Sequence, residues 1–302
     1  MPKLAFIITA HNDAIHLKRL IDSLPLDAEF FIHIDAKSDI TAFTSLIDSP
    51  RVHFCKKRIN VMWGSIGVVD SQMAIIKDAL DYGTRFDYLI SMSGLDYPLW
   101  SNSQILNFFE AHKGTEFIYG VPMESQGKAS LEYRHHRPFN YKYWPYGTLK
   151  SKFRVALRHI IYGIGIHKPL HFTAQGKKYD LYKGAMWWAI SPELAEAAYQ
   201  NWAGNKAFYH YFHDSFAPDE TFIPTTAFND EKFRSKTLGK VATFTKLEDV
   251  TPLTFIDYTH GIKILDESDL PRLKASGKMF CRKTITGPSD QLMDLIDEMR
   301  LD

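Results

Sequence analysis

The chain has 302 residues, of which 45% are hydrophobic and 14% are aromatic, and this is ample material for the packed core of a folded protein. The formal net charge of +1 argues against a nucleic-acid-binding protein or an acidic tail, since both carry a large excess of one sign. The two cysteines, Cys55 and Cys281, are too few for a disulfide framework or a structural zinc site, so both are expected to be buried free thiols.

The first 120 residues alternate short β-branched or aromatic runs with longer amphipathic stretches, which is typical of βα units that build a mostly parallel sheet. Apolar residues recur at helical spacing between residues 13 and 24 and between residues 66 and 82, so a helix that covers the sheet is expected in each stretch. This half predicts a Rossmann-like α/β fold. Its strands are expected at residues 4–10, 29–34, 51–55, 87–92 and 116–119.

After residue 120 the periodicity gives way to a loop-rich, basic and aromatic segment. Ser191 and Pro192 are expected to begin a helix, because a serine hydroxyl caps the first turn and proline fits the first helical position. Regular structure in this half is expected as a helix at 149–164, a strand at 185–190, a helix at 191–202 and an acidic helix from about residue 289. No Gly/Ser-rich linker separates the halves, which predicts one domain at 1–302, with a nucleotide-binding half at 1–120 and an acceptor-binding, catalytic half at 121–302.

Polar loops follow four of the predicted strands, and in an open α/β sheet the ligand lies beyond the carboxyl ends of the strands. The sequence has neither a dinucleotide-binding glycine fingerprint nor a phosphate-binding P-loop, which argues against dehydrogenases, ATPases and kinases. A nucleotide bound without either motif favours an enzyme that uses a sugar nucleotide. The loops contain His11-Asn12-Asp13, residues 35–39, residues 56–58 with Trp63-Gly64-Ser65, and residues 93–98.

Five short motifs follow one another along nearly the whole chain. They are His33-Ile34-Asp35-Ala36-Lys37-Ser38, Trp63-Gly64-Ser65, residues 88–99 with Gly94-Leu95-Asp96-Tyr97-Pro98, Gly184-Ala185-Met186-Trp187-Trp188, and residues 215–220 with Pro218-Asp219-Glu220. In this order and spacing the sequence resembles the core-2/I-branching glycosyltransferase family, which includes β-1,6-N-acetylglucosaminyltransferases, xylosyltransferases and glucuronosyltransferases. The resemblance implies a GT-A-type α/β fold, a UDP-sugar donor, inversion at the anomeric carbon and, for the branching enzymes, catalysis without a metal ion.

The implied absence of a metal can be compared with the residues. Most GT-A enzymes hold the donor diphosphate through a divalent metal on an Asp-x-Asp pair, because phosphate and carboxylate oxygens are ligands that hard cations prefer. The sequence contains no Asp-x-Asp, and the pairs Asp35/Asp39 and Asp266/Asp269 have the wrong spacing. No metal and no other cofactor is therefore expected.

Without a metal, Lys and Arg side chains must neutralise the departing UDP. The pair Arg282-Lys283 is expected at the nucleotide, because Lys283 matches the family's phosphate-binding lysine near the C-terminus. The family's second cation, an arginine, has no clear match. His260 aligns with it, and Lys263 and Arg272 follow nearby.

Inverting transfer needs a base that takes the proton from the attacking hydroxyl, and a carboxylate is the usual choice. Glu220 corresponds to the family's catalytic glutamate, and Pro218 is expected to begin a short helix that holds it. Taken alone, Asp219 and Glu220 could be ordinary first-turn acids that complement a helix dipole. The whole series of motifs favours Glu220 as the catalytic base, with Asp219 beside the reacting sugars.

Other donor-site residues follow from the resemblance. It implies that Asp35 contacts uridine, with His11, Lys37 and Trp63 in the surrounding nucleotide-binding loops. It also implies that Asp96 lies beside the donor sugar. As bare residues, Asp35 and Asp96 could equally be turn formers.

Trp187 and Trp188 fall within the strand expected at 185–190, so their rings are expected to point to opposite faces of that strand. Aromatic faces bind the C–H faces of sugars, and buried tryptophans also fill cores. One ring is therefore expected to form a sugar platform, and the other is expected in the core.

The segment from Lys128 to Lys178 has seven Lys and four Arg against one Glu, a net charge of +10 that leaves −9 for the rest of the chain. Three interpretations stay open: a solvated face, a site for an anionic acceptor, or a surface that docks on anionic membrane through the helix at 149–164. The resemblance implies acceptor contacts in this region, at Glu124, Arg134 and Arg137. The close histidine pairs of the chain, His135-His136 and His210 with His213, lack the three or four convergent ligands of a zinc site.

Together these features predict an inverting glycosyltransferase that moves GlcNAc, xylose or glucuronate from a UDP-sugar to a carbohydrate hydroxyl of a polysaccharide or lipid-linked glycan. A nucleotidyltransferase would carry a glycine-rich loop after the first strand, and the sequence has none. A non-catalytic carbohydrate-binding protein of the same fold would not need Glu220 and Lys283. Because no signal peptide and no stretch of ~20 apolar residues is found, a cytoplasmic enzyme is expected, either free or peripheral on a membrane.

Overall fold

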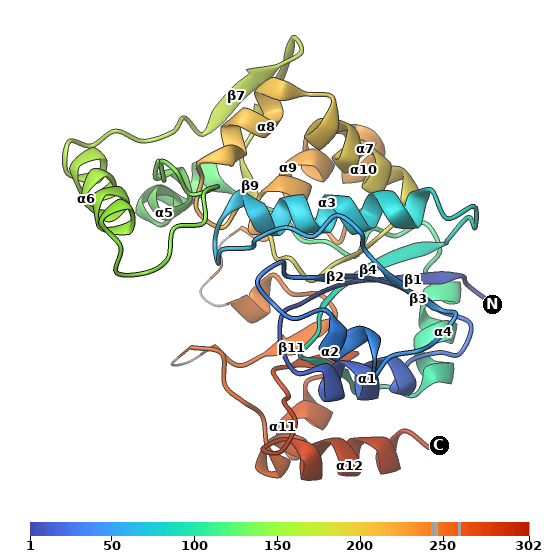
Figure 1. The fold of residues 1–302 in the computed structure, drawn as a ribbon. Helices are drawn as coiled ribbons and strands as arrows, with labels where there is room; N and C mark the ends of the chain where they lie inside the picture. The colour runs from blue at the N-terminus through green and yellow to red at the C-terminus, as the bar shows by residue number, and fades with distance from the viewer. Residues whose placement is uncertain (243, 245–246, 259–260, 302) are drawn as a thin grey trace.

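A computed structural model describes residues 1–242, 244, 247–258 and 261–301. Its largest sheet has the strand order β10-β4-β1-β2-β3, in which β1 to β4 are parallel and β10 is antiparallel to β4 (Figure 1). The strands that follow β1 first add on one side of it, as β2 and β3, and β4 then pairs with β1 on its other side. The direction in which strands are added to the sheet therefore reverses at β1. The strands are β1 (Leu4–Ala10), β2 (Glu29–Ile34), β3 (Val52–Phe54), β4 (Tyr88–Ser93) and β10 (Ala189–Ile190).

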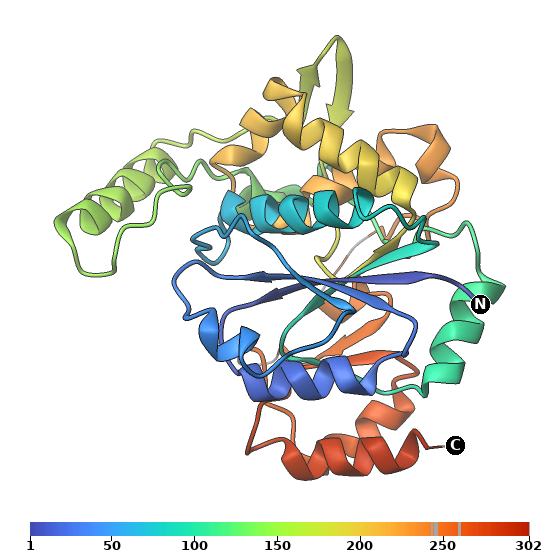
Figure 2. The ribbon, with the colours of Figure 1, turned by 45° about the vertical axis from the view of Figure 1, so that its right-hand side comes forward.

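Helices cover both faces of this sheet, as Figures 1 and 2 show. Leu4, Phe6 and Ile8 of β1 belong to one hydrophobic core and Ala5 and Ile7 to another, because successive side chains of a strand point to opposite faces. The first core also contains residues of α1 (Ala14–Ser23), α2 (Thr41–Thr44) and α4 (Asn102–Ala111). The second contains residues of α3 (Ile66–Leu80), α7 (Pro192–Ala203), α8 (Lys206–His213) and α9 (Phe222–Phe228).

A second, smaller sheet joins the C-terminal region to the first half of the chain. Its order is β11-β12-β5, with β11 (Thr254–Ile256), β12 (Phe280–Arg282) and β5 (Asp96–Pro98). The antiparallel pair β12 and β5 brings Arg282 opposite Asp96. A third core lies between this sheet and the C-terminal helices η4 (Glu267–Asp269), α11 (Leu270–Ala275) and α12 (Asp290–Met299).

One helix, α6 (Leu149–Gly163), stands away from the layered body in both views (Figures 1 and 2). Two strand pairs lie in the same half of the chain, β6 (Val121–Pro122) with β9 (Tyr182–Lys183) and β7 (His171–Ala174) with β8 (Lys177–Asp180). No helix in the described part of the chain has the length and apolar character that a membrane span needs. The remaining helices are η1 (Met123–Ser130), α5 (Leu131–Arg134), η2 (Pro218–Glu220), α10 (Glu231–Arg234) and η3 (Leu247–Asp249).

The predicted α/β fold, a mostly parallel sheet flanked by helices in the GT-A style, is confirmed, and β1 and β2 have the predicted bounds. Ser191 caps α7 as expected, and both cysteines are buried free thiols. Two predicted strands were wrong. Residues 116–119 form only isolated bridges, and of residues 185–190 only the last two pair with a neighbour, because both segments lie where the sheet ends.

Candidate active site

A cleft of about 940 Å³ opens at the carboxyl ends of β1, β2 and β4. This is the edge at which a reversal of strand order leaves room for a ligand. Loops from both halves of the chain form its walls. The cleft brings together eight of the predicted site residues: His11, Asp35, Lys37, Trp63, Trp187, Asp219, Glu220 and Arg282.

The loop after β2 holds a fixed pair of opposite charges. Lys37 donates two hydrogen bonds to the Asp35 carboxylate, from its backbone nitrogen at 2.9 Å and from Nζ at 2.6 Å. Arg58 fixes the loop from below by donating to the backbone oxygens of Ile34 and Asp35. Burial lowers the pKa of neighbouring His11, against the opposing effect of Asp35, so His11 is neutral at pH 7.

Asp96 lies behind the cleft wall rather than in it. Its side chain is fully buried, and it accepts hydrogen bonds from Arg282 at 3.0 Å, from Trp187 Nε1 at 2.9 Å and from the Ser93 backbone at 2.8 Å. Burial raises the pKa of Asp96, while Arg282 opposes the shift. The role of Asp96 in this arrangement is to position Arg282 and Trp187, whose guanidinium and ring lie 5.3 Å apart.

The two adjacent tryptophans lie in different surroundings, and neither is part of a strand. Both precede β10, so the prediction that they alternate across a strand was wrong. Trp187 lines the cleft, and its indole N–H is held by Asp96. Trp188 is 1% exposed and belongs to the core beneath α3 and α7.

Glu220 ends the short 3-10 helix η2 and points into the cleft. Its Oε2 lies 2.9 Å from Nζ of Lys183 and accepts a hydrogen bond of 2.9 Å from the hydroxyl of Tyr133. The Lys183 side chain is only 2% exposed, whereas that of Glu220 is 22% exposed. A buried ammonium is stable only with such partners, so the pair fixes the carboxylate at the wall of the cleft.

Close packing between two of the sequence motifs sets the position of η2. Gly64 has φ +66°, and a Cβ on it would lie 2.8 Å from the ring of Phe216. The carbonyl of Gly64 also accepts a hydrogen bond from the backbone of Ala217, whose own φ is +43°. Only glycine combines this backbone conformation with this approach, so Trp63-Gly64-Ser65 serves as a platform for the loop that carries Glu220.

The sequence matches a model of a known protein family. Residues 4–274 match the family model described as "Branch: Core-2/I-Branching enzyme". The chain belongs to the Core-2/I-Branching enzyme family. The resemblance seen in the sequence motifs is thereby confirmed.

Members of the Core-2/I-Branching family with curated names are distant relatives of this chain. A Bos taurus relative named beta-1,3-galactosyl-O-glycosyl-glycoprotein beta-1,6-N-acetylglucosaminyltransferase is 24% identical over 72% of this chain and 46% of its own length. Xylosyltransferase oxt of Drosophila melanogaster is 24% identical over 41% of this chain and 15% of its own length. The matched segments thus span less than half of either relative.

Among solved structures, a complex of glucosyl-3-phosphoglycerate synthase from Mycobacterium tuberculosis with Mn²⁺, UDP and glucosyl-3-phosphoglycerate is 12% identical to this chain. The alignment covers 82% of this chain and 74% of the synthase, with a TM-score of 0.36. The likeness at that score is too low to inform on the site of this Core-2/I-Branching family member.

Sequence reasoning missed the two residues that hold Glu220 in this family member. A signal for Lys183 was present, because it is a single charge in the apolar run 181–190 and directly precedes the motif that begins at Gly184. Gly184 itself donates a 2.7 Å hydrogen bond to the backbone oxygen of Glu220. Tyr133 had no such signal, since its contact with Glu220 spans 87 positions in the chain.

Asp219 also lines the cleft, but one of its oxygens is enclosed. Oδ1 has no hydrogen-bond partner among the described residues. Burial and the adjacent charge of Glu220 raise the pKa of Asp219 to about 7. This carboxyl group is therefore partly protonated near neutral pH, in contrast to an ordinary first-turn acid.

Four other predicted site residues lie outside the lining of the cleft. Lys283 is half-buried, and its charge acts on His11, which does line the cleft. Glu124 is exposed in η1, and Arg134 donates to the backbone oxygen of Lys168. Arg137 lies over the ring of Phe216 at 3.8 Å and lines a different cavity. Acceptor contacts by these residues stay predictions.

The position aligned with the family's second cation, His260, lies outside the described residues. Of the two alternatives near it, Arg272 lines the cleft and pairs with Asp257 at 3.0 Å. Lys263 pairs with Asp269 at 2.7 Å and is not part of the lining. Arg272 is thus the better placed of the two for a ligand in the cleft.

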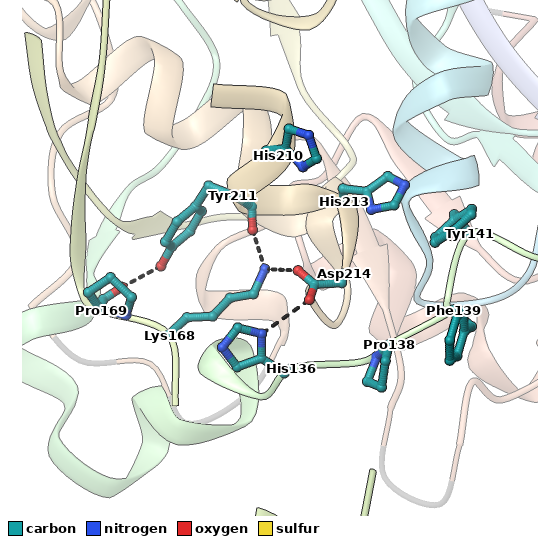
Figure 3. A pocket seen from close by; sticks show the side chains of 10 residues that line it. All are labelled: His136, Pro138, Phe139, Tyr141, Lys168, Pro169, His210, Tyr211, His213 and Asp214. Carbon is teal, nitrogen blue, oxygen red and sulfur yellow. Dashed lines mark hydrogen bonds and ion pairs between the residues drawn. The ribbon is translucent and has the colours of Figure 1, made fainter. Parts of the chain in front are cut away.

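Figure 3 shows a separate hollow of about 410 Å³ that holds several of the histidines. Asp214 lies at its centre and pairs with Lys168 on one oxygen and with His136 at 3.1 Å on the other. His210 and His213 lie across the hollow, with no dashed contact to Asp214. Within the described ranges, no three His, Cys, Asp or Glu residues are grouped so as to hold a metal ion.

Proposed function

We propose that this chain is an inverting glycosyltransferase that moves a sugar from a UDP-sugar to a carbohydrate hydroxyl, with Glu220 as the general base. The observation that carries the proposal is the setting of Glu220, whose carboxylate lines the cleft and is held by Lys183 and Tyr133. Both contacts involve Oε2, which leaves Oε1 as the oxygen that accepts a proton. Membership of the Core-2/I-Branching family supports the same assignment.

The proposed reaction is a single displacement. The acceptor oxygen attacks the anomeric carbon from the face opposite UDP, and its proton passes to Oε1 of Glu220. The bond between the anomeric carbon and the UDP oxygen breaks, and UDP leaves with the electron pair and the negative charge. The cleft supports this step with Arg282 and Lys37, whose charges can offset that of the departing diphosphate.

The donor sugar is proposed as GlcNAc, xylose or glucuronate, and Trp187 as the platform for a sugar ring. Calorimetric titration of UDP-GlcNAc, UDP-xylose and UDP-glucuronate tests this proposal, and we expect one of the three to bind more tightly than the other two. Transfer from that donor to oligosaccharide acceptors should then release UDP. If no UDP-sugar binds at millimolar concentration, a non-catalytic carbohydrate-binding protein becomes the better interpretation.

We also propose that α6 docks on an anionic membrane surface, where lipid-linked glycans are assembled. Leu149, Phe153 and Ile160 form an exposed apolar stripe, with 84%, 58% and 60% of each residue accessible. Their spacing places them on one face of the helix, and the exposed Lys150 and Lys152 lie beside that face. An apolar stripe bordered by lysines is the pattern that binds anionic lipid interfaces.

A further inference from the structure

A third cavity, of about 350 Å³, lies between α6 and the segment that follows α5. Among the described residues, it shares none of its lining with the cleft. Its lining includes the basic residues His135, Arg137 and Arg158 and the apolar residues Val155 and Ile161. The cavity therefore combines positive charge with an apolar wall.

The arginines at this cavity are not neutralised by carboxylates. Arg158 donates to the side-chain oxygen of Asn140 at 2.6 Å, and Arg154, one turn earlier in α6, donates to the backbone oxygen of Lys142 at 3.0 Å. Arg137 lies over an aromatic ring. Within the described part of the chain, none of the three forms an ion pair with Asp or Glu, although Arg154 is buried and Arg137 and Arg158 are half-buried.

Two acidic residues lie near this cavity: Glu132, whose charge acts on Arg137, and Asp214, whose backbone oxygen accepts a hydrogen bond from the Arg137 backbone. Figure 3 shows that Asp214 pairs with Lys168 through one carboxylate oxygen and with His136 through the other. Burial, together with the charges of Arg137 and Arg154, lowers the pKa of Arg158 to about 10. In the empty cavity these like charges therefore repel one another.

Buried nitrogen atoms without hydrogen-bond partners also gather here. Of the seven such nitrogen atoms found among the described residues, four belong to residues that line this cavity or neighbour its lining: Nε of Arg154, Nε of Arg158, Nε2 of His135 and Nδ1 of His167. Leaving a buried donor unsatisfied costs about 1 to 3 kcal/mol, so the two guanidinium Nε–H groups favour a ligand that accepts hydrogen bonds here.

We propose that this cavity binds the phosphoryl group of a phosphate ester. A phosphoryl group carries negative charge and three acceptor oxygens, which suits two guanidinium groups and a histidine around one space. The apolar wall formed by Val155 and Ile161 suits the carbon group that an ester carries beside its phosphate. This site is separate from the cleft, and it does not depend on the transfer reaction proposed above.

The cations are held rigidly before any ligand arrives. Asn140 accepts from Arg158 and donates to the backbone oxygens of Gly64 and Ser215, at 2.9 and 3.3 Å. Arg137 is fixed over Phe216 in the same loop. Because these side chains are already ordered, binding loses little conformational entropy, which favours affinity.

The experiment titrates the full chain with phenyl phosphate by calorimetry, with phenol as the neutral control. We expect a Kd below about 1 mM for phenyl phosphate and no measurable binding of phenol. Arg158→Gln should weaken phenyl phosphate binding by about tenfold or more, since it removes a charge-assisted hydrogen bond. Lys152→Gln removes the same charge from an exposed position of α6 and should change the Kd by less than about twofold.

Folding is checked on the same samples. The melting temperature of Arg158→Gln without ligand should equal or exceed that of the wild type, because an unpaired buried charge is removed. Arg158→Lys, which keeps the charge but not the planar donor pair, supplies a second variant with an intermediate loss of affinity. The proposal would be contradicted if both variants melted at a lower temperature than the wild type while their folded fraction bound phenyl phosphate with unchanged affinity.

A second experiment distinguishes a lipid phosphate from a soluble phosphate ester. It measures binding to phosphatidylcholine vesicles that contain either phosphatidic acid or phosphatidylglycerol. If Arg158→Gln reduces binding to phosphatidic acid vesicles alone, the cavity takes a lipid phosphate monoester. If it affects only phenyl phosphate, the cavity takes a soluble ester. Equal binding of phenyl phosphate by wild type and Arg158→Gln, together with equal vesicle binding, overturns the proposal.

Discussion

At the scale of single residues, the pair of Lys183 and Glu220 has both a structural and a chemical consequence. Lys183 is buried against the rings of Tyr133 and Phe244, at 5.2 and 4.5 Å, and its only carboxylate partner among the described residues is Glu220. Removing one member of a buried ion pair commonly costs about 3 to 5 kcal/mol, because the other charge is left without compensation. Glu220 is therefore expected to matter for stability as well as for transfer.

The first prediction concerns Glu220→Gln. The amide keeps the size of the side chain but cannot accept the proton of the acceptor hydroxyl, so transfer at saturating substrates should fall by about a hundredfold or more. The affinity for UDP-sugar should stay within about twofold, since Glu220 is not assigned to the nucleotide. The measurements are the rate of UDP release and the Kd of the donor. Near wild-type transfer would refute the assignment of the base.

A double variant separates the chemical role from the structural one. Glu220→Gln alone leaves Lys183 buried without a carboxylate and should unfold at lower temperature than the wild type. Adding Lys183→Met removes that charge and should restore part of the lost stability, while transfer stays low. Recovery of transfer together with stability would mean that Glu220 acts only as the partner of Lys183.

The second prediction concerns the pH dependence caused by Asp219. Its pKa is raised from the ordinary value of 3.8 to about 7, so between these values the folded state binds a proton that the unfolded state releases. The free energy of unfolding must then decrease as pH rises through this window, by up to about 1.4 kcal/mol for each unit of the pKa difference. Asp219→Asn does not titrate. Its stability relative to the wild type should therefore increase from about pH 5 to pH 8 in urea denaturation, and a constant difference would contradict the shift.

At the scale of elements, local patterns predicted the helices and central strands well. The strand at 4–10 and the helix at 191–202 were predicted to within a residue or two, because hydrophobic period and capping are local properties. The strand expected at 116–119 failed because pairing there depends on the distant bridges of Glu116 and Phe117. The pocket residues were found through motifs, whereas Lys183 and Tyr133 depend on contacts between separate elements that no local pattern encodes.

The third prediction concerns Gly64, which joins the loop before α3 to the loop that carries η2. Gly64→Ala places a Cβ 2.8 Å from Phe216 at a positive φ, so it should lower stability by about 1 to 3 kcal/mol and displace the loop that holds Glu220. Gly83→Ala is the matched control, because Gly83 has φ +84° but no atom near the new Cβ. Both variants should lose stability, and only Gly64→Ala should lose transfer by about tenfold or more. Equal transfer by the two would show that the contact is not needed.

The fourth prediction concerns α6. Replacing Leu149, Phe153 and Ile160 by Ser should reduce the affinity for phosphatidylcholine–phosphatidylglycerol vesicles in sedimentation by at least about tenfold, because full loss of apolar burial costs up to roughly 1.5 to 3 kcal/mol at each position. Wild-type binding should weaken as salt rises, since Lys150 and Lys152 contribute through screened charges. If wild-type protein does not bind the vesicles at low ionic strength and is fully active on a soluble acceptor, α6 does not dock on membranes and is a solvated surface.

At the scale of the whole molecule, the cleft is assembled from distant parts of the chain. Asp96 and Arg282 lie 186 positions apart and meet only because β5 and β12 pair in the second sheet. The cations available to a diphosphate, Arg282 and Lys37, thus come from opposite ends of the sequence. Sequence reasoning reached both residues through motifs, but their common location follows from the sheet topology.

The last prediction is that UDP binds without a divalent metal. The carboxylates nearest the donor site are already engaged: Asp96 is fully buried and accepts three hydrogen bonds, and both oxygens of Asp35 accept from Lys37. A metal would have to displace these donors, so we expect the Kd of UDP to change by less than about twofold when EDTA is added. Lys283→Gln should instead weaken UDP binding by several-fold, because it removes a positive charge that acts on His11 in the cleft. Calorimetry with EDTA and then with excess Mn²⁺ distinguishes UDP binding without a metal from UDP binding through a metal. A large loss of affinity with EDTA that Mn²⁺ restores would mean that a metal held by Asp35 binds the diphosphate.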